Sequence, residues 1–171
     1  MAAIVTALMT AVEGVQYDGA AAFQRVEFFD CEKLADAFQY LLITEQRVCV
    51  VVPLEERFST ISKQPLLQIK RRLPVLLMIS DRVIGSSNRK VALLGNDTTP
   101  GAQGLVDLTL PAVTGAIIAN PSGVLCIPID STIMTIAAKD QAKLPGRLCI
   151  CLELECTGGL ITTNTGPGGI V

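Results

Sequence analysis

Two glutamates near the C-terminus, Glu153 and Glu155, are the residues whose type and spacing best suit catalysis. In an extended strand they would share one face, about 7 Å apart, which is comparable to the carboxylate separations that glycosidases use. Asp81 is a further acidic candidate. However, paired acids on a wet strand face are common, and the chain has no tryptophan to stack on a sugar. A small carboxylate-dependent hydrolase is therefore an alternative hypothesis, behind ion pairing with a neighbouring subunit.

The cysteines offer the next possible chemistry, because Cys149, Cys151 and Cys156 lie close together in the sequence. Zinc sites hold such pairs on turns and add further cysteine or histidine ligands. Strand alternation would instead send Cys149 and Cys151 to one face and Cys156 to the other. We therefore predict no metal site and no cofactor, and we expect reduced and mostly buried thiols.

The chain has no histidine, which excludes Ser-His-Asp and Cys-His catalytic arrangements. It also lacks a phosphate-binding loop and a Gly-x-Ser-x-Gly nucleophile elbow. The glycine-rich residues 166–169 have no following helix that could present amides to a phosphate. These features together predict that the protein is not an enzyme.

Lys70, Arg71 and Arg72 form the main basic cluster of a chain whose net charge is −2. Nucleic-acid-binding surfaces usually combine a broad basic stripe with stacking aromatic residues, and neither is evident here. A nucleic-acid-binding adaptor is thus a second alternative, and we expect DNA contact to be at most incidental. We predict that the cluster is either a solvated face or a contact to acidic residues of another subunit.

The elements that would position these residues follow from hydrophobic periodicity. The pattern predicts helices over residues 2–13 and from about 32 to 42, the second capped by Asp30. It predicts strands at 25–29, 47–53, 75–79 and 147–156, with Pro74 marking an entry or bulge before the third. Residues 47–53 are apolar on both faces, as in a central strand. The expected fold is α+β, a mixed and mainly antiparallel sheet with the two N-terminal helices packed on one face.

The remaining segments are less regular. We expect a loop or exposed excursion at residues 54–65 and a loop-like stretch at 85–104 that contains a short strand, 90–94. Residues 105–110 alternate as a strand does, and 115–129 suit a hairpin around an Asn-Pro-Ser-Gly turn. Residues 130–144 fit either a helix or a strand.

The last segment, residues 157–171, is rich in glycine and threonine and has no charged side chain. Such a tail is costly to order by itself. We therefore divide the chain into one domain, 1–156, and a tail, 157–171, that docks on a neighbouring subunit; packing on its own domain is the alternative. The predicted interface residues in the tail are Leu160, Ile161, Ile170 and Val171.

Neither a basic signal-peptide start nor an apolar run of the roughly 18 residues needed to cross a bilayer is present. We expect no membrane partner and synthesis in a cytoplasm. Half of the residues are apolar, which is generous for a domain of this size and suggests that other copies cover part of the surface.

The order of these elements resembles the tail terminator (tail completion) proteins of tailed bacteriophages. The resemblance covers the whole layout: helix, strand, capped helix, the strands at 47–53 and 72–81, and the final strand at 146–155. It implies a homo-oligomeric ring, commonly of six copies, at the head–tail junction of the virion, with other tail and neck proteins as partners and no catalytic residues. The stretch 83–104 and the extended tail depart from it, and would suit another neck, connector or baseplate protein.

Overall fold

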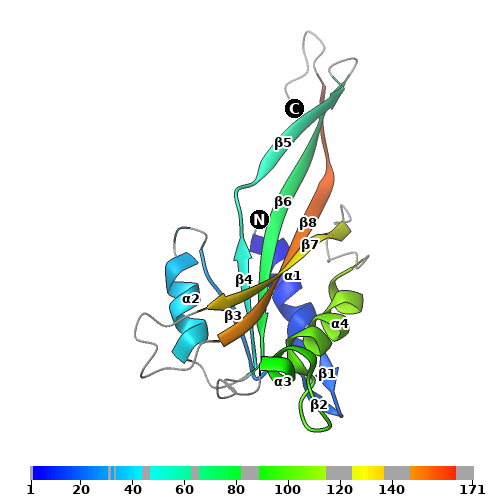
Figure 1. Cartoon of the computed structure of the whole chain (residues 1–171). Helices are drawn as coiled ribbons and strands as arrows, with labels where there is room; N and C mark the ends of the chain where they lie inside the picture. Colours follow the sequence, from blue (N-terminus) through cyan, green and yellow to red (C-terminus); the bar gives the residue numbers. More distant parts are fainter. Residues whose placement is uncertain are drawn as a thin grey trace.

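The computed structural model describes residues 2–30, 32, 34–43, 47–62, 66–81, 89–114, 125–136 and 147–164. Figure 1 shows a twisted sheet with helices on both faces and a long β-structured projection at one end. The elements in chain order are α1 (Ala2–Glu13), β1 (Gln16–Tyr17), β2 (Ala20–Ala21), β3 (Arg25–Phe28), α2 (Leu34–Ile43), β4 (Val48–Pro53), β5 (Arg57–Ser62), β6 (Leu66–Ser80), α3 (Arg89–Leu94), α4 (Gly101–Val113), β7 (Leu125–Ile136) and β8 (Arg147–Asn164).

The main sheet has the strand order β3-β4-β6-β8-β7, and β5 pairs with β6 outside that path. β3 and β4 are parallel, and every other pair in this sheet is antiparallel. The sheet is therefore mixed and mainly antiparallel, which confirms the α+β prediction. β4 lies inside the sheet and all six of its residues are buried, as its apolar pattern on both faces predicts.

The two N-terminal helices pack on opposite faces of the sheet, so the prediction that they share one face is wrong. Leu8 and Val12 of α1 join the larger core cluster, together with Cys49 of β4. Leu41 of α2 joins the smaller cluster, together with Val50 of β4. Residues 49 and 50 point to opposite faces of a strand, so β4 is apolar throughout because it supports a helix on each side. α4 packs on the same face as α1.

Most of the segment from 89 to 113 is helical, in α3 and α4 joined by a turn at 95–100, whereas the sequence pattern predicts a loop and short strands. Leu105, Thr109 and Val113 are buried at intervals of four residues, which is the helical spacing, and they join or adjoin the core on the α1 face. The alternation at 105–110 misleads because Leu108 is exposed, whereas Leu110 packs against the core from the same helix. Pro111 is tolerated in the last turn, where few hydrogen bonds remain to be lost.

β6 runs without a break from Leu66 to Ser80, so Pro74 does not mark the start of a strand. The carbonyl oxygen of Pro74 accepts a hydrogen bond from the amide of Leu54 at 2.9 Å. The backbone polar groups of Pro74 therefore face the short connection between β4 and β5. The missing amide proton of proline falls at that connection, where the ladder is already interrupted.

Three further predictions met different outcomes. Residues 57–62 form strand β5 rather than a loop, because they pair with β6. The ambiguous segment that begins at 130 is a strand as far as Ile136. The final strand is confirmed and is longer than expected: residues 157–164 of the proposed tail continue β8 and pair with β6. Residues 115–124, 137–144 and 165–171 lie outside the described residues.

Candidate functional site

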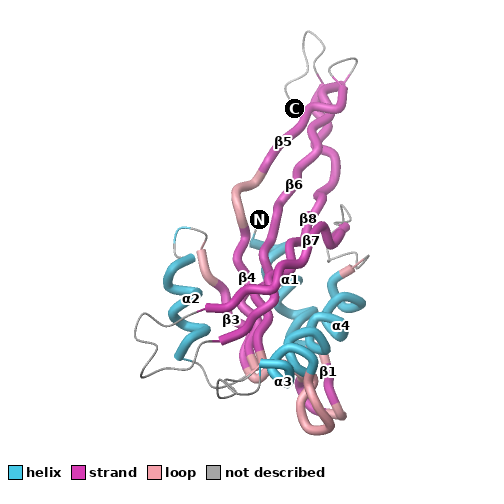
Figure 2. The backbone as a smooth tube through the Cα atoms, viewed as in Figure 1, coloured by secondary structure: helices cyan, strands magenta, loops and turns pink. Residues whose placement is uncertain are grey.

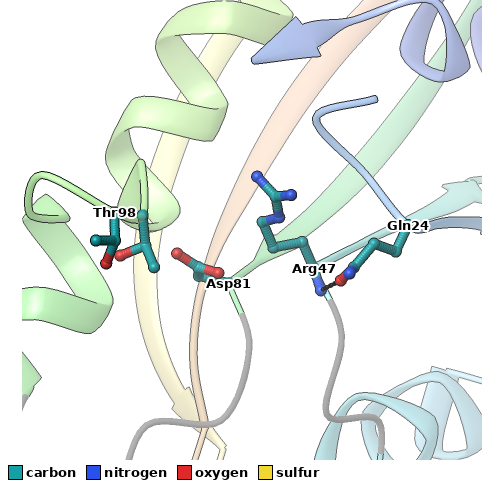
Figure 3. A pocket seen from close by; sticks show the side chains of 5 residues that line it. Gln24, Arg47, Asp81 and Thr98 are labelled. Carbon is teal, nitrogen blue, oxygen red and sulfur yellow. Dashed lines mark hydrogen bonds between the residues drawn. The ribbon is translucent and has the colours of Figure 1, made fainter. Parts of the chain in front are cut away.

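A polar pocket lies between the end of β6 and the start of α4 (Figure 3). It has a cavity volume of about 90 Å³. The residues that line it are Gln24, Arg47, Asp81, Thr98 and Thr99. The pocket thus offers one carboxylate, one guanidinium, hydroxyl groups and an amide.

Asp81 has a structural task in this pocket. Its side chain is buried, and its Oδ2 accepts a hydrogen bond from the amide of Gly101, the first residue of α4, at 3.0 Å. The residue before it, Pro100, has no side chain that can cap the helix. Asp81 therefore supplies a negative charge and an acceptor at the positive end of α4, which are the two functions of an N-cap.

Arg47 is held at the other side of the pocket. Its guanidinium lies over the ring of Tyr17, 5.7 Å from the ring centroid, and its backbone amide donates to the Oε1 of Gln24 at 2.9 Å. Among the described residues that line the cavity, none supplies a second carboxylate or a thiol. The described pocket therefore lacks the paired acids that the hydrolase hypothesis requires.

The predicted carboxylates lie elsewhere on the sheet. Glu155 stands opposite Pro74 in the β6–β8 register, and Glu153 stands opposite Leu76, whereas Asp81 follows the far end of β6. The structure therefore does not bring Asp81 together with Glu153 and Glu155. It does bring two predicted interface residues together, because Arg72 pairs with Glu155 at 3.7 Å.

Arg71 also has a partner within the chain. Its Nη2 lies 2.6 Å and its Nε 2.8 Å from the Oε1 of Glu56, and its guanidinium lies over the ring of Phe58. Two members of the basic cluster are thus neutralised internally. Lys70 forms no ion pair with any residue that the structure describes.

The tail residues of the predicted interface are only partly placed. Leu160 and Ile161 belong to β8, and Ile161 is the register partner of Ile69. Ile170 and Val171 lie outside the described residues.

The distal parts of three strands project beyond the helices, and we call them the arm (Figure 2). The arm consists of Arg57–Ser62, residues 66–72 of β6 and residues 157–164 of β8. The arm side chains whose burial the structure describes, those of residues 57–60, 69–72 and 157, belong to neither buried core cluster.

Large apolar side chains are exposed mainly on edge strands. The described chain has seven such side chains, and five of them belong to β3, β5 and β7. These five are Phe28, Phe58, Ile127, Ile129 and Ile133. The outer edges of β3, β5 and β7 pair with no strand in the described parts of the chain. The sequence pattern missed this feature, because the exposure of an apolar strand residue depends on what lies beside the strand.

The buried thiols behave as the sequence predicts. Cys126 and Cys156 are register partners on the face that carries α1, while Cys149 and Cys151 lie on the α2 face. Burial raises the pKa of the Cys49 thiol, and a hydrogen bond with Cys126 together with burial raises the pKa of Cys156. No group of three or more possible metal ligands occurs among the described residues.

No protein-family model matches the chain, and a search of curated proteins gives no significant match. Within the part of the chain that the structure describes, none of the helices has the length and apolar character needed to cross a membrane.

Proposed function

We propose that the protein is a structural subunit of a virion, and that it assembles with copies of itself into a ring at the head–tail junction of a tailed bacteriophage. Within that assembly it would act as a tail terminator and would contact other tail and neck proteins. Another neck, connector or baseplate position is the closest alternative.

The observation that carries this proposal is the concentration of exposed apolar side chains on open strand edges. A soluble monomer normally protects its edges with charged residues, proline or a covering element, because open edges pair with other chains. Here β5 and β7 each present at least one large apolar side chain beside an unpaired edge of the described sheet. Such edges are suited to contacts between subunits.

The position of these edges supports a ring. β5 pairs with β6 on the side of β4, whereas β7 pairs with β8 at the other side of the sheet. A contact between two different surfaces of identical subunits is heterologous, and it gives a closed ring when the rotation between subunits closes. The α+β fold with a mixed sheet also agrees with the tail-terminator resemblance, from which the place in the virion is taken.

Light scattering coupled to size-exclusion chromatography tests the proposal. We expect a mass that is a whole multiple of the 18.1 kDa chain and that persists on dilution, because obligate interfaces bury about 2,000 Å² or more. Co-incubation with purified phage tails that lack their terminator should then give binding at one tail end. A chain that remains monomeric at all concentrations and with such tails would contradict the proposal.

A further inference from the structure

The β7 edge combines exposed aliphatic side chains with negative charge. Ile127, Ile129 and Ile133 are 46%, 55% and 52% exposed. Ile129 lies at an irregularity in the β7–β8 register, where the ladder shifts between Pro128 and Asp130. Ile127 is the register partner of Glu155 and Ile133 that of Ile150, so these two isoleucines lie on opposite faces of the edge strand.

The negative charge on this edge has no ion-pair partner among the residues that the structure describes. Asp130 on β7 is the direct register partner of Glu153 on β8. Neither forms an ion pair with another described residue. Like charges directly opposite in a sheet destabilise the pair, so a cation supplied from outside would relieve this repulsion.

The β5 edge of the arm has the complementary character. Phe58 is 59% exposed, and the neighbouring Arg57 is exposed as well. Lys70, on the adjacent strand, is the register partner of Ser59. Arg57 and Lys70 form no ion pair within the described chain, so this edge presents two available cations on one face and the ring of Phe58 on the other.

From this complementarity we infer that the β5 edge of the arm docks against the β7 edge of a second copy of this chain. Phe58 packs against Ile133 and the neighbouring Ile129 on one face, and Arg57 and Lys70 approach Asp130 and Glu153 on the other. This inference rests on the proposed self-assembly and specifies which two surfaces meet.

Two other pairings fit the charges less well. Joining two β7 edges would bring together Asp130 and Glu153 of both copies, which adds repulsion. Joining β7 to β3 would offer no available cation, because Arg25 on β3 lies 3.5 Å from Glu27 of the same strand. The β5–β7 pairing is the one that relieves the like-charge pair.

Mixing two complementary variants tests the inference. The arm variant carries Phe58→Asp, and the edge variant carries both Ile129→Lys and Ile133→Lys. Each destroys one half of the contact and leaves the other half intact. Leu94→Asp is the matched control, since Leu94 is 57% exposed but lies on α3, away from the strand edges.

We expect each variant alone to lose self-association by at least about tenfold, as for a central interface residue, while the control assembles like the wild type. An equimolar mixture of the two variants should form a 1:1 heterodimer, because one intact β5 edge meets one intact β7 edge. Circular dichroism spectra that match the wild type show that each variant is folded.

The other outcomes overturn the inference in distinguishable ways. A wild-type oligomer that survives Phe58→Asp rules out the arm as a docking element but leaves self-assembly standing. If the edge variant fails to assemble while the arm variant still assembles, the β7 edges pair with each other. Variants that lose association yet remain monomeric when mixed contradict the β5–β7 contact. A monomeric wild type refutes both this inference and the proposed function.

Discussion

Replacing Asp81 separates a structural role for its carboxylate from a catalytic one. In Asp81→Ala, the amide of Gly101 at the start of α4 loses its acceptor in a buried setting. Leaving a buried donor unsatisfied costs about 1–3 kcal/mol, and the lost charge at the helix N-terminus costs about 0.3–1 kcal/mol more. We therefore expect the free energy of unfolding to fall by about 2–3 kcal/mol. Asp81→Asn keeps an acceptor oxygen and should lose only about 1 kcal/mol, mainly the charge contribution.

Equilibrium urea unfolding at one fixed protein concentration measures both effects, because self-association makes stability depend on concentration. Asp107→Ala is the control: this acid is exposed on the same helix and makes only a local bond to Gln103, so the change should stay within about 0.5 kcal/mol. If Asp81→Ala were no more destabilising than the control, the capping role would be wrong.

The remaining predictions concern backbone geometry, burial and charge. Gly101→Ala should destabilise the fold by more than about 1 kcal/mol, measured by thermal unfolding, because φ is +68° and a Cβ would come within 3.0 Å of backbone atoms of Leu93, Leu94 and Gly95. An unchanged melting temperature would contradict this geometry. Burial raises the pKa of Cys49, so the folded state keeps a proton that the unfolded state loses above its ordinary value of 9.0. The contribution of this thiol to the free energy of unfolding should therefore be steady below about pH 9 and fall above it, by at most about 1.4 kcal/mol per pH unit. In urea titrations at several pH values, the free energy of unfolding of Cys49→Ala should fall less steeply above about pH 9 than that of the wild type. Equal slopes would refute the assignment. Glu155→Gln breaks only a partly exposed pair with Arg72 and should cost no more than about 1 kcal/mol in urea unfolding, whereas a larger loss would show a role beyond that pair.

The sequence pattern identifies the elements whose own residues specify which of their side chains are buried. α1 follows its helical spacing, β4 is apolar on both faces, and β8 alternates Leu148, Ile150, Leu152 and Leu154 against the opposite face. In each case the side chains of one segment are sufficient to specify the element. β5 is not predicted in this way, because it is a mostly polar edge strand that forms by pairing with β6.

α4 could not be predicted from its own residues. Its first residue is held by Asp81, twenty positions earlier in the chain, and no local side chain caps it. Turn-forming residues just before it favoured a loop, and the leucines at 108 and 110 imitated strand alternation. A helix whose start depends on a distant partner gives no local signal at that end.

The candidate interface was predictable only in part. Arg72 and Glu155 were selected as interface residues from the sequence, and the structure pairs them with each other inside one chain. The exposed isoleucines of β7 were not selected, because an apolar strand at a sheet edge has the same sequence pattern as an apolar strand in the interior.

Electron microscopy of the purified wild-type protein tests the central claim most directly. We predict class averages of a closed ring with one rotational symmetry, in which the arm of each subunit reaches the β7 edge of its neighbour. Single separate particles of one chain each, at concentrations well above those used for imaging other phage rings, would contradict the account.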